Sequence, residues 1–158
     1  MKSDEKTNVL RLLESRKIPH TAHTYEPNSA LTGEEIARLL GENPDHVFKT
    51  LVTRGKSGRF FVFVIPVPRE LDLKKAAKAA GEKSVAMILQ KELLPLTGYV
   101  HGGCSPVGMK KPFPTFLDAS AQGLDRIFVS AGKVGFQAEL SPKDLLSLVP
   151  FRYADLTE

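Results

Sequence analysis

Residues 47–52 read Val47-Phe48-Lys49-Thr50-Leu51-Val52, and a second run, Phe60-Phe61-Val62-Phe63-Val64-Ile65, follows a short turn. Valine, isoleucine, phenylalanine and threonine favour strands. The segment between the runs, Arg54-Gly55-Lys56-Ser57-Gly58, is typical of a hairpin turn. The sequence therefore predicts two strands that pair antiparallel.

Lys49 lies inside the first of these runs, where its neighbours favour a buried or half-buried strand. A lysine on an edge strand can lay its stem on apolar surface and keep its ammonium in water. A buried ammonium instead needs an anionic or strongly polar partner, because burial alone costs several kcal/mol or removes the proton. A ligand with phosphate or carbonyl oxygens would supply that partner.

The remaining elements follow from apolar spacing and from capping residues. A first helix is expected from Ser3 or Asp4 to just before Pro19, and a second follows Thr32-Gly33-Glu34-Glu35 and stops at Gly41. Further helices are expected over 73–80, 90–96 and 141–149, and further strands over 20–25, 115–118, 126–130 and 151–156. Since strands and helices do not alternate regularly, we expect an α/β fold of the α+β type, with a mixed or antiparallel sheet flanked by helices.

Composition sets the class of protein. With 158 residues, 42% hydrophobic and 25% charged, the chain fits one soluble globular domain over residues 1–158. The longest apolar stretch contains Pro66 and is too short for a membrane span, and the N-terminus has no apolar segment of a secretory signal. A lone Cys104 excludes an internal disulfide. Together with the lack of a membrane span and of a secretory signal, it leads us to expect a cytoplasmic protein with no membrane contact. A net charge of +4 is only a mild bias toward polyanions.

Several familiar catalytic patterns can be weighed against the spacing. Cys104 with His101 could form a thiol nucleophile and its base, but a lone cysteine is usually inert packing. Ser130-Ala131-Gly132-Lys133 has the spacing of a Ser-x-x-Lys acylase, which needs both residues on one helical turn, whereas a glycine turn is expected here. The histidines stand at 20, 23, 46 and 101 without clustered ligands, so we expect no metal and no cofactor.

Three weak elements remain: Lys49 with Thr50, the glycine-rich segment from Gly102 to Gly108, and the strand-to-turn segment Val129-Ser130-Ala131-Gly132. Glycine loops expose backbone N–H groups that bind carbonyl or phosphate oxygens. The three elements could line one small polar pocket.

Four motifs carry a resemblance to a known family. They are Phe48-Lys49-Thr50-Leu51, Leu73-Lys74-Lys75-Ala76-Ala77, the segment from Gly98 to Gly108, and Val129-Ser130-Ala131-Gly132-Lys133-Val134-Gly135. Together, and in this order, they resemble the YbaK/EbsC group of aminoacyl-tRNA deacylases, which is related to the editing domain inserted in bacterial prolyl-tRNA synthetases. The resemblance covers nearly the whole chain. It implies a single α/β editing domain with a central mixed, partly barrel-like sheet.

The resemblance also implies a pocket for the aminoacylated 3' end of tRNA. The residues it assigns to catalysis are Lys49, Gly102 and Gly103, and those it assigns to substrate binding are Tyr25, Thr50, Ser130, Gly132 and Gln137. Two positions depart from the family pattern: Cys104 replaces an aliphatic residue, and Gln137 replaces an aspartate. The second departure leaves substrate choice open.

The best-known members of the family remove cysteine from proline tRNA, and the implied chemistry needs no protein nucleophile. The thiol of the substrate attacks its own ester, which releases tRNA and a cyclic thioester. Lys49 would hold phosphate or ribose oxygens, and N–H groups near Gly102 and Gly103 would face the oxyanion.

Two other functions stay open from the sequence. The first is hydrolysis by water of Ala-tRNA(Pro) or another small aminoacyl ester, and the second is a non-catalytic module that binds tRNA or a synthetase. The expected partners are the acceptor end of aminoacyl-tRNA and prolyl-tRNA synthetase, which would supply tRNA identity to a protein expected to be a monomer.

Overall fold

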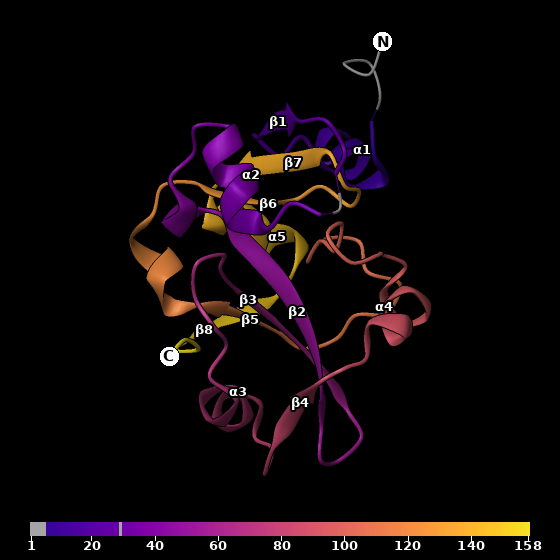
Figure 1. Cartoon of the computed structure of the whole chain (residues 1–158), viewed down its shortest axis with the longest axis vertical. Helices are drawn as coiled ribbons and strands as arrows, with labels where there is room; N and C mark the ends of the chain where they lie inside the picture. The colour runs from indigo at the N-terminus through magenta and orange to yellow at the C-terminus, as the bar shows by residue number, and fades with distance from the viewer. Residues whose placement is uncertain (1–5, 29) are drawn as a thin grey trace.

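The computed structural model describes residues 6–28 and 30–158. Its elements, in chain order, are α1 (Asn8–Ser15), β1 (Thr21–Thr24), α2 (Gly33–Leu39), η2 (Pro44–His46), β2 (Phe48–Gly55), β3 (Phe60–Pro66), α3 (Leu73–Ala80), β4 (Val85–Met87), α4 (Gln90–Thr97), β5 (Thr115–Asp118), η3 (Ala119–Gly123), β6 (Ile127–Ser130), β7 (Phe136–Leu140), α5 (Pro142–Leu148) and β8 (Phe151–Ala154). Figure 1 shows β2 running from the part of the molecule that holds β1, β6 and β7 to the part that holds β4.

The strands form two sheets. A three-stranded antiparallel sheet has the order β1-β7-β6, and a five-stranded mixed sheet has the order β4-β2-β3-β5-β8. The two sheets meet at an isolated parallel bridge between Val47 and Phe128. The expected mixed, largely antiparallel α/β fold is therefore confirmed, with the hydrogen bonding divided between two sheets.

The hairpin of β2 and β3 lies at the centre of the larger sheet. The strands pair antiparallel as predicted, and the turn is closed by the Gly55 N–H, which donates to the Arg59 carbonyl at 2.8 Å. Strand β3 also pairs parallel with β5, so it is interior to the sheet. This position explains its unbroken apolar run, because an interior strand covered on both faces has no solvent side.

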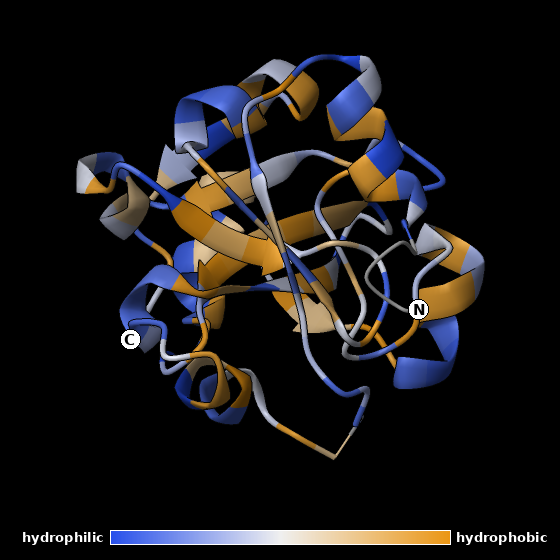
Figure 2. Cartoon of the chain, turned by 90° about the horizontal axis from the view of Figure 1, so that it is seen from above, coloured by the Kyte–Doolittle hydropathy of each residue, from blue (hydrophilic) through white to orange (hydrophobic). Residues whose placement is uncertain are grey.

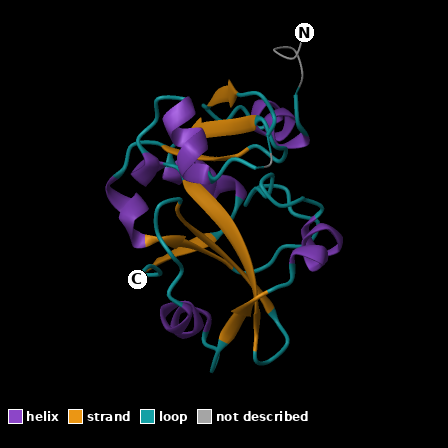
Figure 3. Cartoon of the chain, viewed as in Figure 1, coloured by secondary structure: helices purple, strands orange, loops and turns teal. Residues whose placement is uncertain are grey.

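The two faces of this hairpin belong to two hydrophobic clusters. Val52, Val62 and Val64 pack with residues of the smaller sheet, such as Val129 and Leu140, so the main core lies between the sheets. The opposite face packs against α3 in a second cluster, which contains Phe61, Phe63, Ile65, Ala76 and Ala77 among others. Figure 2 shows apolar strands inside and mixed or polar helices around them, and Figure 3 shows the long loop that follows α4.

Most predicted elements are present. The capping box of α2 forms as expected, and the helices over 73–80, 90–96 and 141–149 match α3, α4 and α5 to within a residue or two. The expected start of the first helix at Ser3 or Asp4 lies outside the described residues, and α1 begins at Asn8 with Thr7 as its cap. The sequence prediction missed β4 and β7.

Candidate functional site

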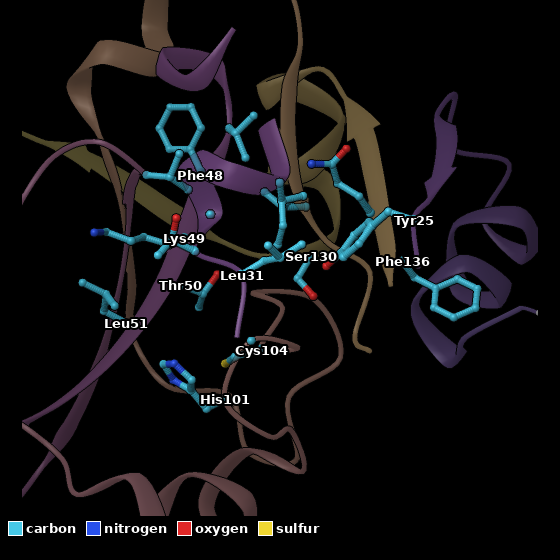
Figure 4. A pocket seen from close by; sticks show the side chains of 18 of the residues that line it. Tyr25, Leu31, Phe48, Lys49, Thr50, Leu51, His101, Cys104, Ser130 and Phe136 are labelled. Carbon is cyan, nitrogen blue, oxygen red and sulfur yellow. The ribbon is translucent and has the colours of Figure 1, made fainter. Parts of the chain in front are cut away.

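A cavity of about 230 Å³ lies where β2, the loop after α4, and the β6–β7 pair come together. Figure 4 shows this cavity from close by, with Thr50, Cys104 and Ser130 on neighbouring walls. Its wall includes six of the predicted site residues, which are Tyr25, Lys49, Thr50, Gly102, Ser130 and Gln137. Gly103 and Gly132 do not line it. The three sequence elements expected to share one pocket are thus brought together.

Lys49 is half-buried and has no hydrogen-bond or ion-pair partner among the residues that the structure describes. In Figure 4 its side chain and that of Leu51 leave β2 on one side, and the side chain of Thr50 leaves on the other. This alternation is that of any strand. Lys49 is thus one of the residues that line the cavity, while its ammonium extends away from Thr50 and Ser130 (Figure 4).

The edge of β2 that faces the cavity has no neighbouring strand beside its central residues. Residues 53–55 pair with β4 and Val47 bridges to Phe128, which leaves 48–51 paired only with β3 within the described chain. The Val52 carbonyl accepts from the Ile88 N–H, so even-numbered residues of β2 turn their backbone groups away from β3. The backbone N–H and carbonyl of Thr50 consequently face this open edge.

Two side chains in the cavity wall carry buried polar atoms that have no hydrogen-bond partner among the described residues. They are Thr50 Oγ1 and Gln137 Oε1, and Gln137 is only 5% exposed. A buried polar atom left unsatisfied costs about 1–3 kcal/mol. Both atoms sit on residues that line the cavity and that were predicted to bind substrate.

Glu42 is a functional candidate that the sequence prediction missed. The Gln137 amide donates through Nε2 to Glu42 Oε1 at 2.9 Å, and Glu42 Oε2 is buried with no hydrogen-bond partner in the part of the chain that the structure describes. Burial raises the pKa of the Glu42 carboxyl above its ordinary value, although the Gln137 hydrogen bond and the nearby His23 oppose this shift. His23 itself bonds to Glu139 at 2.8 Å on the adjacent strands.

Of the two adjacent glycines in the loop, Gly102 and Gly103, the first lines the cavity and the second does not. Gly102 has a φ of +87° and lines the cavity. Gly103 does not line it, and its N–H already donates to the Val100 carbonyl at 3.0 Å, so the expected oxyanion donor at Gly103 is occupied in this structure. A Cβ on Gly103 would lie 3.1–3.3 Å from the backbone of Lys133 and Val134, so this glycine allows the loop to contact the turn after β6.

Gly132 shapes that turn from behind the cavity wall. Its N–H donates to Ser130 Oγ at 3.2 Å, which leaves the Ser130 hydroxyl proton available to a ligand. Its φ is +95°, and a Cβ there would lie 3.0 Å from Val9 and 3.1 Å from Tyr99. Gly132 thus supports Ser130 indirectly, through backbone geometry.

Gly132→Ala is expected to lower the free energy of unfolding by about 1–3 kcal/mol, because both the left-handed backbone and the close contacts oppose a side chain. Urea titration followed by circular dichroism measures the loss. Gly123→Ala is the matched control, since Gly123 has no neighbouring atom within 4 Å of its Cβ position. Equal stability of the two variants would contradict the role given to Gly132.

Cys104 and His101 both line the cavity, yet the thiol is unsuited to act as a nucleophile. Burial raises the pKa of the Cys104 thiol to about 12, despite an opposing hydrogen bond from Thr97. Since the thiolate is the reactive form, very little of it exists at neutral pH. Ser130 ends β6 and is not on a helix, so the Ser-x-x-Lys geometry is absent at this position.

Within residues 6–28 and 30–158, no three His, Cys, Asp or Glu side chains cluster as they would around a metal ion. None of the helices in the same part of the chain is long and apolar enough to cross a membrane.

Comparison with known proteins identifies the family. Residues 27–148 match the aminoacyl-tRNA editing domain. An Enterococcus faecalis protein named "Putative Cys-tRNA(Pro)/Cys-tRNA(Cys) deacylase EbsC" is 46% identical over 157 residues, which are 99% of this chain and 96% of that protein. Proline--tRNA ligase of Shouchella clausii is 30% identical over 79% of this chain, which corresponds to only 20% of the ligase.

A solved structure described as a "putative trans-editing enzyme for prolyl tRNA synthetase" superimposes with a TM-score of 0.81 and 28% identity, covering 98% of this chain and 99% of that one. The chain therefore belongs to the family of aminoacyl-tRNA editing domains, as its four motifs predicted. Within that family it is an aminoacyl-tRNA deacylase of the YbaK/EbsC group.

Proposed function

We propose that this protein removes cysteine from wrongly charged Cys-tRNA(Pro), with Cys-tRNA(Cys) as a further substrate, and that it acts in trans on tRNA outside the synthetase. The observation that carries the proposal is a small cavity lined by Lys49, Thr50 and Gln137, in which Lys49 and the buried oxygens of the other two side chains have no partner among the described residues. Such a cavity suits a small aminoacyl ester whose ribose and phosphate extend past Lys49. The name of the Enterococcus relative supports cysteine as the amino acid.

In the proposed reaction the substrate supplies its own nucleophile. The cysteinyl sulfur attacks the ester carbonyl carbon, the bond from that carbon to the ribose oxygen breaks, and the ribose oxygen takes up a proton. A thiol with a pKa near 8.5 is already a few per cent ionised at neutral pH. The neutral Cys104 thiol supports this route, because the cavity wall offers no competing thiolate.

The chain's own residues would fold the substrate and stabilise charge. Lys49 holds phosphate or ribose oxygens, while Tyr25, Thr50, Ser130 and Gln137 surround the aminoacyl group. Gly102 is the glycine of the loop that can approach the developing oxyanion, since the N–H of Gly103 is already bonded. Gly103 and Gly132 act on this arrangement through the turns they form.

The proposal treats residues 1–158 as one editing domain that works as a monomer in the cytoplasm, where tRNA is charged. Prolyl-tRNA synthetase is the proposed partner that supplies tRNA identity. The partial match to proline--tRNA ligase supports this choice, because it covers most of this chain.

A panel of tRNAs charged with cysteine, alanine, serine or proline tests the proposal. Each is incubated with the pure protein, and loss of the ester is followed by acid gel electrophoresis. We expect rapid loss from Cys-tRNA(Pro) and little from the others. Preference for Ala-tRNA(Pro) would favour hydrolysis by water, and tRNA binding with no ester loss would favour a non-catalytic module.

A further inference from the structure

The Gln137 side chain presents an unusual arrangement in the cavity wall. The residue is almost fully buried, its amide nitrogen donates a hydrogen bond to Glu42, and its amide oxygen has no partner within residues 6–28 and 30–158. Glu42 follows the end of α2, whereas Gln137 lies on β7, 95 residues away in sequence. The contact therefore exists only because the fold brings α2 against the smaller sheet.

We infer that Glu42 is a positioning residue, whose carboxylate fixes the Gln137 amide so that Oε1 accepts a hydrogen bond from a donor on the bound aminoacyl end of tRNA. This inference rests on the proposed function. The donor is either the α-ammonium of the amino acid or the ribose 2'-hydroxyl, since both lie next to the ester.

The direction of the Glu42 contact follows from the chemistry of the two groups. An ionised carboxylate can only accept hydrogen bonds, so it must face the amide nitrogen of Gln137 and not its oxygen. If the Gln137 amide were reversed, its Oε1 would lie about where Nε2 now lies, 2.9 Å from Glu42 Oε1. Two acceptor oxygens would then face each other without a proton between them. A neutral side chain at position 42 would accept either orientation, because it could also donate to the amide oxygen.

The charges around Glu42 are compatible with this role. His23 on β1 and Glu139 on β7 face it, and they bond to each other at 2.8 Å. Lys49 leaves β2 on the side opposite to Thr50 and Ser130, and Ser130 is the register neighbour of Gln137. The cation thus lies on the other side of β2 from Ser130, whose register neighbour carries the amide acceptor. This separation suits a ligand with phosphate at one end and an ammonium or hydroxyl donor at the other.

Steady-state kinetics with the preferred charged tRNA test the inference. Glu42→Gln keeps the size of the side chain but removes the preference for one amide orientation, so we expect KM to rise about tenfold with kcat nearly unchanged. Glu34→Gln is the matched control, because Glu34 is partly exposed on α2, the helix that precedes Glu42, and makes only a 3.9 Å contact with Arg38. Its kinetics should equal those of the parent.

Two further readouts separate positioning from a structural role. Burial raises the pKa of Glu42, so the parent's KM should increase as the pH falls through that raised value, and Glu42→Gln should lack this step. The double variant Glu42→Gln with Gln137→Glu reverses the acceptor and donor across the contact, and it should return KM toward that of the parent.

The donor is identified by two altered substrates, an N-acetylated aminoacyl-tRNA and a tRNA that ends in 2'-deoxyadenosine. With the substrate that lacks the donor, the parent and Glu42→Gln should have equal KM values. A difference that persists with both substrates overturns the inference.

Thermal unfolding of the parent and of Glu42→Gln shows whether a change in KM comes from a loss of folding. The pKa of Glu42 is raised because burial disfavours its charged carboxylate. The protonated form therefore stabilises the folded protein at low pH, and this stabilisation is lost as the pH rises through the pKa of the folded state. Glu42→Gln should therefore be at least as stable as the parent at pH 7. If the parent cleaves charged tRNA and Glu42→Gln has the same KM and the same pH dependence, the inference about Glu42 is overturned and the proposed function stands. If the parent cleaves no charged tRNA, the proposed function is overturned as well.

Discussion

Lys49→Ala is expected to lower kcat/KM for ester cleavage by about 100-fold, since a charge-assisted hydrogen bond to a phosphate or ribose oxygen is lost. The free energy of unfolding should change by no more than about 0.5 kcal/mol, because the ammonium is half-buried and has no partner to abandon within the described chain. Single-turnover cleavage of charged tRNA and urea titration measure the two quantities.

The salt dependence of binding adds a second test of Lys49. If the ammonium neutralises a phosphate, the variant should release about one counterion fewer, which lowers the slope of log affinity against log salt concentration. Lys56→Ala is the control, because Lys56 is an exposed lysine in the turn of the same hairpin. Unchanged turnover in Lys49→Ala would remove this residue from the site.

Blocking the substrate thiol is expected to slow cleavage at least about 100-fold, because an attacking group held next to the ester is worth a very large effective concentration. S-methylcysteinyl-tRNA(Pro) is the substrate for this test, since it keeps the sulfur of cysteine and loses the nucleophilic thiol, with one methyl group added. With the unmodified substrate, the rate should rise with pH toward the thiol's reference pKa of about 8.5.

The first product distinguishes the two routes directly. Attack by the thiol yields a cyclic thioester, which is lighter than free cysteine by one water, and rapid quenching followed by mass spectrometry detects it. Similar rates for cysteinyl and S-methylcysteinyl substrates, with free amino acid as the first product, would show that water performs the cleavage.

The central hairpin could be predicted from the sequence because local signals agree there. Apolar strands flank a glycine-containing turn, and both the pairing and the turn are observed. The parallel pairing of β5 with β3 and with β8 could not be predicted in the same way, since parallel pairing depends on long crossovers and not on a local turn. Strand β4 has only three residues, too few for a periodic signal.

Strand β7 was missed although a signal existed. Phe136-Gln137-Ala138-Glu139-Leu140 alternates apolar and polar residues, which is typical of a strand. The burial does not follow this alternation, because Gln137 is buried with its apolar neighbours. The polar residue that breaks the pattern is the one that lines the cavity.

The candidate site was predictable only in part. The motifs identified Lys49, Thr50 and Ser130, and these residues do share a cavity. Glu42 carries no sequence signal, since it follows a helix-ending glycine and would normally be solvated. Only the tertiary fold shows that its carboxylate is partly buried against Gln137.

The open edge of β2 at Thr50 affects how substrate specificity can change. Main-chain N–H and carbonyl groups are present whatever side chain occupies a position. A hydrogen bond from them to the ester or ribose of a substrate would therefore survive a substitution. Side chains such as Gln137 can then vary to admit a different amino acid while the constant part of the substrate stays in place. One scaffold could in this way serve several mischarged tRNAs, each selected by a few replaceable residues around an unchanging strand.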